Sequence, residues 1–240
     1  MKCLQVNEVV YTYQNKYQTV QALRGVSADF VQGQMYAIIG TSGSGKTTLL
    51  SLLAGLDVPS AGSITWNGES TASLDRDQYR LEHVSVIYQN FNLFFHLTVL
   101  ENVAYPLYVR KTAKQDADDI AREQLLAVGL TEDQWGRFPN MLSGGEQQRV
   151  AIARALAAGS EIILADEPTG SLDSENSQNI VEILRQLAHG NNRCVIIVTH
   201  DPAVADAVDV VLRMKDGKVF TDTAKTPLPG AQPGIQHSQP

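Results

Sequence analysis

The chain has 240 residues, 43% of them hydrophobic, which is enough to fill the core of one large domain or two small ones and excludes disorder of the whole chain. Its 19 Lys and Arg residues against 26 Asp and Glu residues give a net charge of −7, so composition offers no electrostatic reason to expect a nucleic-acid partner. The two cysteines, Cys3 and Cys194, show neither metal-ligand spacing nor a disulfide pattern, which favours a reducing compartment.

Strand patterns dominate the first part of the chain. Short apolar or alternating segments predict strands over 4–13, 26–30, 35–39, 62–68 and 84–88. A glycine-rich turn follows the third of these segments, and residues 47–53 then have the pattern of a helix. From about residue 97 to 128 the apolar residues recur at helical spacing, which predicts a helical insertion.

After Pro139 the pattern alternates again: a helix over 146–157, a strand over 161–165, a helix around Ile180 to Leu187 and a strand over 193–199. Apolar strands that alternate with amphipathic helices indicate an α/β fold whose parallel sheet is covered on both faces. From about residue 222 the chain is rich in proline and poor in large apolar residues, so we expect 223–240 to be a disordered tail.

No apolar run approaches the ~20 residues that a membrane-spanning helix needs, the longest being 35–39 and 194–198. The first residues, MKCLQVNEVVYTY, lack the apolar core of a signal peptide. We therefore expect a cytoplasmic protein that reaches a membrane only by binding something already there.

The glycine-rich turn fits the phosphate-loop pattern G-x-x-x-x-G-K-[ST]. Its residues are Gly40, Thr41, Ser42, Gly43, Ser44, Gly45, Lys46 and Thr47. The glycines let successive N–H groups point at a phosphate chain, and the helix start adds partial positive charge. Lys46 supplies a full positive charge, and the Thr47 hydroxyl is placed to ligate Mg²⁺. The loop predicts a nucleoside triphosphate site, with Thr48 as a further contact.

Acidic and imidazole side chains follow two other apolar strands. Asp166 and Glu167 come directly after 162–165, and His200 follows the strand that ends near Thr199. Because ligands bind at the carboxyl edge of open α/β sheets, we expect these residues beside the phosphates. Asp166 would serve Mg²⁺ directly or through its water, and Glu167 would orient or deprotonate the attacking water. His200 would contact the γ-phosphate.

A second glycine motif, Leu142-Ser143-Gly144-Gly145-Glu146, precedes another predicted helix. Free N–H groups at a helix start again favour a phosphate. One triphosphate has little use for two such helix starts from one domain. We therefore expect this motif to face a nucleotide held by another copy of the chain.

Together these motifs resemble the ABC transporter ATPase family, over about residues 4–220. The resemblance is carried by GTSGSGKT, Gln89 after VSVIY, LSGGE, IILADEP, the loop that contains Ser171 and Asp173, and His200. It implies a P-loop NTPase with a RecA-like parallel core, an antiparallel β region and a helical subdomain near 90–138, in a nucleotide-binding domain over 1–222. It also implies a head-to-tail homodimer that holds two ATP molecules between the phosphate loop of one subunit and the LSGGE of the other.

The resemblance also assigns roles. Tyr13 matches the aromatic residue that stacks on adenine, although an ordinary strand tyrosine stays an alternative. Gln89 would sense the γ-phosphate and Mg²⁺, Glu167 would be the catalytic base, and Asp173 and Glu146 would lie at the shared nucleotide site. The segment from Gln89 to Val103, dense in apolar residues, would bind a helix of a membrane permease at the cytoplasmic face, or else pack the helical subdomain onto the core.

Motifs such as LTVLENV and ADEPTGSLDS are similar to the branch whose permeases export macrolides, antimicrobial peptides or lipoproteins, or act in cell division and antibiotic sensing. Ser171 replaces a more usual asparagine, and Phe95 a common proline. Two other classes stay open: an ABC ATPase that serves no transporter, and a module that binds ATP without hydrolysing it. The former class has tandem domains or long coiled coils, which this sequence lacks.

Overall fold

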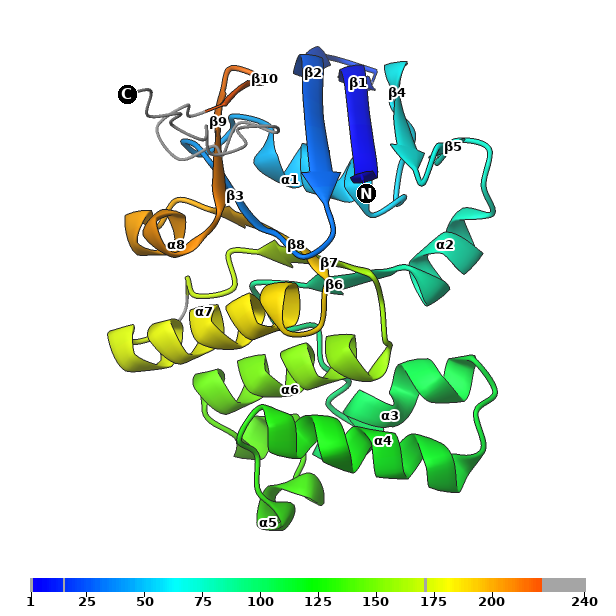
Figure 1. The fold of residues 1–240 in the computed structure, drawn as a ribbon, viewed down its shortest axis with the longest axis vertical. Helices are drawn as coiled ribbons and strands as arrows, with labels where there is room; N and C mark the ends of the chain where they lie inside the picture. The colour runs from blue at the N-terminus through cyan, green and yellow to red at the C-terminus, as the bar shows by residue number, and fades with distance from the viewer. Residues whose placement is uncertain (1, 15, 171, 222–240) are drawn as a thin grey trace, which may run out of the picture.

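The computed structural model describes residues 2–14, 16–170 and 172–221. The predicted tail, 223–240, and Ser171 lie outside this part of the chain. Figure 1 shows two sheets and a layer of helices, with the antiparallel sheet at the top, the larger sheet in the middle and the helices below. Helix α1 (Lys46–Leu53) lies between the two sheets.

The smaller sheet is antiparallel and has the strand order β2-β1-β4-β5. Its strands are β1 (Lys2–Gln14), β2 (Thr19–Val31), β4 (Ala61–Trp66) and β5 (Glu69–Ser70). Strand β2 begins seven residues before the predicted position, because its polar first half pairs with β1 from Gln14↔Thr19 onward. Backbone pairing along β1, and not apolar alternation, extends this strand.

The larger sheet has the order β10-β9-β3-β8-β7-β6. Its strands are β3 (Met35–Ile39), β6 (Val84–Ile87), β7 (Ile162–Asp166), β8 (Cys194–Thr199), β9 (Val210–Lys215) and β10 (Lys218–Thr221). All neighbouring strands pair in parallel, including β9 with β3, except that β10 pairs with β9 as an antiparallel hairpin. This hairpin was not predicted from the sequence.

Both faces of the parallel sheet are buried, as its apolar strands predict. In β3, Ala37 packs into the core shared with the helices, whereas Ile38 faces the core between the two sheets. The latter core also brings together Cys3 and Cys194, which are buried free thiols that hydrogen-bond to each other. That hydrogen bond and burial raise the pKa of the Cys194 thiol, which makes it unreactive.

The remaining helices cover the lower face of the sheet or connect its strands (Figure 1). They are α2 (Arg76–Glu82), α3 (Val99–Val109), α4 (Lys114–Ala127), α5 (Glu132–Trp135), the 3₁₀ turn at Pro139–Met141, α6 (Gly144–Ala157), α7 (Ser174–His189) and α8 (Pro202–Ala207). The short α2, α5 and α8 were not predicted. In the part of the chain that the structure describes, no helix has the length and apolar character to cross a bilayer.

Candidate functional site

The phosphate loop joins β3, which lies between β9 and β8 in the larger sheet, to α1. Glycine is required at two of its positions by the space around them. A Cβ on Gly40 would lie 2.2 Å from the Met214 carbonyl oxygen, and one on Gly45 would lie 2.7 Å from that of Ala22. Gly45 also has a φ of 105°, which only glycine adopts without strain. The loop is therefore held in one curled path.

Lys46, the first residue of α1, is 8% exposed although it carries a full charge. Its Nζ donates hydrogen bonds to the carbonyl oxygens of Gly40, at 2.8 Å, and Thr41, at 3.1 Å. Among the described residues, no side chain caps the start of α1. Its first N–H groups, the dipole of the helix and the Lys46 ammonium together form an anion site.

Asp166 ends β7 beside this loop. Burial raises the pKa of the Asp166 carboxyl, and the adjacent Glu167 carboxylate raises it further. The Lys46 ammonium and a hydrogen bond from the Thr47 hydroxyl act in the opposite direction but do not compensate. The site thus contains a half-buried acid in contact with a hydroxyl and near an ammonium group, which is an environment suited to a hard divalent cation.

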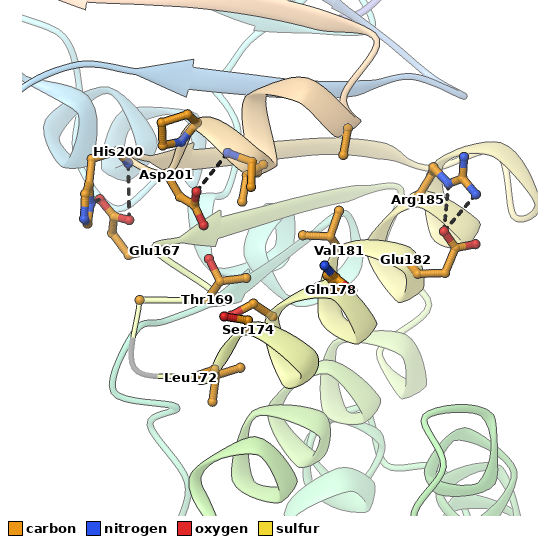
Figure 2. A pocket seen from close by; sticks show the side chains of 16 residues that line it. Glu167, Thr169, Leu172, Ser174, Gln178, Val181, Glu182, Arg185, His200 and Asp201 are labelled. Carbon is orange, nitrogen blue, oxygen red and sulfur yellow. Dashed lines mark hydrogen bonds and ion pairs between the residues drawn. The ribbon is translucent and has the colours of Figure 1, made fainter.

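Glu167 follows Asp166 with a left-handed φ of 47°, which turns its side chain toward the end of β8. One oxygen of its carboxylate accepts hydrogen bonds from the Thr199 hydroxyl at 3.1 Å and from the backbone N–H of His200 at 3.4 Å. The Nδ1 atom of His200 lies 2.8 Å from the other carboxylate oxygen. Figure 2 shows Glu167 and His200 side by side at one end of a groove between α7 and α8. A left-handed non-glycine residue at such a position is strain of the kind found at functional sites.

A cavity of about 1020 Å³ brings most of the expected nucleotide and catalytic residues together. The predicted residues that line it are Tyr13, Thr41, Ser42, Gly43, Gly45, Lys46, Thr47, Thr48, Gln89, Asp166, Glu167 and His200. Gly40 and Ser44 belong to the same loop but do not line this cavity. Half-exposed Tyr13 lies at the outer end of this set, with its hydroxyl 3.1 Å from that of Thr48.

Further residues that line the cavity were not predicted from the sequence. They are Val20, Gln21, Ala22 and Arg24 of β2, Val198 of β8, and Asp216 and Gly217 of the β9–β10 turn. Asp-Gly between two apolar runs is a hairpin signal and could have identified the last two. Nothing local marks the polar residues of β2, because only the tertiary fold brings them to the loop.

The LSGGE motif lies elsewhere: none of its described residues lines this cavity. Ser143 caps α6, and the Glu146 carboxylate accepts from the Ser143 N–H and hydroxyl, both at 2.7 Å. These bonds hold the pKa of Glu146 below its usual range. Gly144 and Gly145 open the helix, and a Cβ on Gly145 would lie 2.8 Å from Asn176 Oδ1. Asp173 caps α7 and bonds to the same Asn176, which also accepts a hydrogen bond from Arg149 of α6 at 3.2 Å, so the starts of the two helices are in contact.

Comparisons with known proteins agree with this geometry. Residues 23–170 match the family model described as ABC transporter. The chain is 39% identical over 217 residues to the ABC transporter ATP-binding protein YclH of Bacillus subtilis strain 168, covering 90% of this chain and 95% of YclH. It is 42% identical over 219 residues to the macrolide export ATP-binding/permease protein MacB of Escherichia coli strain K12, covering 90% of this chain and 34% of MacB.

Solved structures give the same result. A dimeric structure of MJ0796, titled a bacterial ABC transporter cassette, superposes with a TM-score of 0.83 at 38% identity, over 90% of this chain and 96% of that one. A second structure of MJ0796, in a post-hydrolysis state bound to ADP and Pi, also has a TM-score of 0.83. The chain belongs to the ABC transporter family, as one of its ATP-binding ATPase subunits. The expected P-loop NTPase fold and class of function are confirmed.

The raised pKa of Asp166 predicts a conflict between stability and function. A carboxyl whose pKa is higher in the folded than in the unfolded state stabilises the fold only while it is protonated. This stabilisation is lost as the pH rises through the raised pKa, so the ionised Asp166 no longer favours folding at neutral pH. Asp166→Asn should therefore raise the melting temperature of the nucleotide-free protein at pH 7–8, by roughly 2–4 °C for a chain of this size. The gain should shrink as the pH approaches 4. Differential scanning calorimetry checks this, with exposed Glu69→Gln as the control; an equal effect of the two variants would contradict it.

Proposed function

We propose that this chain binds ATP with Mg²⁺ in the cavity beside the phosphate loop, hydrolyses it, and thereby powers a separate membrane permease. One observation carries the proposal: the uncapped start of α1, the buried Lys46 ammonium and the two acids at the end of β7 meet at one edge of the sheet. In this proposal 1–222 is a single nucleotide-binding domain, with a helical subdomain near 90–138.

The cation would be held by the oxygens of Thr47, Asp166 and Gln89. Hydroxyl, carboxylate and amide oxygens suit Mg²⁺, and the Thr47–Asp166 hydrogen bond already brings the first two together. When bound, Mg²⁺ neutralises charge on the β- and γ-phosphate oxygens. Gln89 follows β6 and lies near Gly170, whose Cβ would be 3.3 Å from its Nε2 atom. Gln89 would therefore couple the state of the nucleotide site to the conformation of the loop that follows it.

Hydrolysis would use the pair of side chains shown in Figure 2. Glu167 would orient the attacking water and accept its proton, because its carboxylate lies beside the phosphate site and is fixed by Thr199. His200 Nδ1 contacts that carboxylate, while the largely exposed ring is free to reach a γ-phosphate. The presence of this pair favours turnover over the alternative of a module that only binds ATP.

The arrangement of LSGGE supports pairing of two chains. Ser143, Gly144 and Gly145 form a preorganised helix start that belongs to no cavity with Lys46 among the described residues. In a head-to-tail dimer this start, with Glu146 holding its cap and Asp173 beside it, would face the nucleotide of the partner. MJ0796, which has this fold, is described as dimeric.

The segment after Gln89 is the proposed docking site for a permease helix. Its apolar residues fall into two groups. Leu93 is buried and Phe91 packs against the helical core, as the packing alternative predicts. Phe94 and Phe95, in contrast, are 44% and 59% exposed. Phe94 borders a groove of about 320 Å³ and packs on Tyr105 with ring centroids 4.6 Å apart. These two exposed rings are what a partner would cover.

Two side chains, partly buried Arg154 and fully buried Asn102, hold this groove in shape. Arg154 of α6 donates to the carbonyl oxygens of Phe91, at 2.9 Å, and Asn92, at 2.7 Å. Fully buried Asn102 of α3 bonds both the N–H and the carbonyl of Phe94. The loop after Gln89 is thus tied to the LSGGE helix, α6, so a change at the nucleotide would be carried to the docked permease.

The transported substrate is proposed from the relatives. MacB is named as a macrolide exporter, and the branch motifs point to export of drugs, antimicrobial peptides or lipoproteins. The chain spans about a third of MacB, which carries its permease in the same polypeptide as its name states. The proposed permease partner would place this subunit on the cytoplasmic face of the cell membrane.

The proposed role of Glu167 predicts that Glu167→Gln keeps ATP binding and loses hydrolysis. The amide preserves shape but cannot accept the water's proton, so the rate should fall by roughly 10²–10⁴. A dimer should accumulate with ATP and Mg²⁺, seen by size-exclusion chromatography. The exposed Glu123→Gln on α4 is the control. A variant that stays monomeric, or that hydrolyses ATP at the normal rate, would refute the assignment.

The docking proposal predicts that Phe94→Ser with Phe95→Ser reduces co-purification with the permease by about tenfold or more. Basal ATPase activity of the isolated subunit should stay within about twofold, because neither ring supports the core. Leu126→Ser on α4 removes a side chain that is equally exposed, at 59%, and should change neither. Equal loss of association and hydrolysis, or unfolding, would instead favour the packing interpretation.

A further inference from the structure

The turn of the β9–β10 hairpin contacts the phosphate loop directly. The Gly217 N–H donates to the carbonyl oxygen of Ser44 at 3.0 Å, and the Gly217 carbonyl accepts from the Arg24 N–H at 2.8 Å. The turn therefore bridges the loop and strand β2 through its own backbone. These two bonds join three segments that are distant in sequence.

The three segments meet around one atom, the carbonyl oxygen of Ala22. A Cβ on Gly45 of the loop would lie 2.7 Å from this oxygen, and a Cβ on Gly217 of the turn would lie 2.6 Å from it. Met214 of β9 closes the other side, since its carbonyl oxygen fills the Cβ position of Gly40 at 2.2 Å. Real Cβ atoms do not approach other atoms so closely, so any side chain at Gly217 must push β2 or the loop.

The chain contains a second turn of the same kind whose glycine has free space around it. Asn67 and Gly68 join β4 to β5, and Asp216 and Gly217 join β9 to β10, each as a two-residue turn between paired strands. All four residues have positive φ, between 48° and 91°, as a type I′ turn requires. A Cβ on Gly68 would meet no atom within 4 Å. Comparing the two turns therefore separates the effect of a Cβ on the turn conformation from its effect on the contact with the phosphate loop.

We propose that Gly217 is a positioning residue for nucleotide binding: the β9–β10 turn holds Ser44 and Gly45 so that the loop N–H groups converge on the phosphates. This inference rests on the nucleotide site proposed above and adds a support that lies about 170 residues away in sequence. The turn acts on the loop backbone and not on Glu167 or His200. Its loss should therefore weaken nucleotide binding more than it slows the chemical step.

The test compares Gly217→Ala with Gly68→Ala in the full chain. Both variants place a Cβ on a left-handed residue, so both should lower the melting temperature, and Gly217→Ala should lower it more because its Cβ also meets the Ala22 carbonyl oxygen. ADP affinity, measured by isothermal titration calorimetry, should fall at least about fivefold in Gly217→Ala and stay within about twofold in Gly68→Ala. In steady-state kinetics, KM for ATP should rise for Gly217→Ala while kcat stays within about twofold.

If Gly217→Ala does not fold, Gly217→Asn and Gly68→Asn repeat the comparison, because asparagine tolerates a left-handed φ but still adds the Cβ. Equal ADP affinity in the two variants, or a loss in kcat with unchanged KM, would overturn the inference. A wild-type protein that binds no ADP would instead refute the nucleotide site itself. The two failures are therefore distinguishable.

Discussion

The burial of the Lys46 ammonium is the constraint on which the rest of the structure depends. A charge that is 8% exposed is stable only with polar partners, and here two backbone carbonyls of its own loop supply them. Those carbonyls face the ammonium only if the chain curls tightly between β3 and α1. The curl in turn needs glycine at positions 40 and 45, where β2 and β9 leave no room for a Cβ. The anion site is therefore a consequence of how two sheets pack around one loop.

The acids at the end of β7 balance this positive charge at a cost in stability. Asp166 is half-buried with a raised pKa, and Glu167 adopts a left-handed backbone conformation beside it. Neither feature helps the nucleotide-free protein to fold, and both make sense once a cation and a phosphate chain are considered. Sites that oppose folding in this way are where functional residues concentrate.

The sequence was informative where function depends on local geometry. The phosphate loop and LSGGE need glycines at fixed offsets before a helix, so both could be predicted, as could the apolar strands that are buried on both faces. The part of the cavity wall contributed by Arg24 could not be predicted, because its place depends on strand order. The Asp216-Gly217 pair is a local signal for a turn, but nothing local shows that this turn reaches a loop about 170 residues earlier in the chain. Phe91 and Phe94 show the same limit: both are phenylalanines of one segment, yet Phe91 packs partly buried against the helical core whereas Phe94 is 44% exposed.

The central claim is that one chain holds only half of each site, and mixing two inactive variants tests it most directly. Lys46→Ala disables the phosphate loop, and Gly145→Glu disables LSGGE, where a Cβ already meets Asn176. In a head-to-tail dimer of the two variants, one site pairs both defects and the other is intact. The account predicts ATPase activity in the mixture, up to roughly a quarter of wild type because half of random dimers are mixed, while each variant alone is inactive. A mixture no more active than its separate components would contradict it.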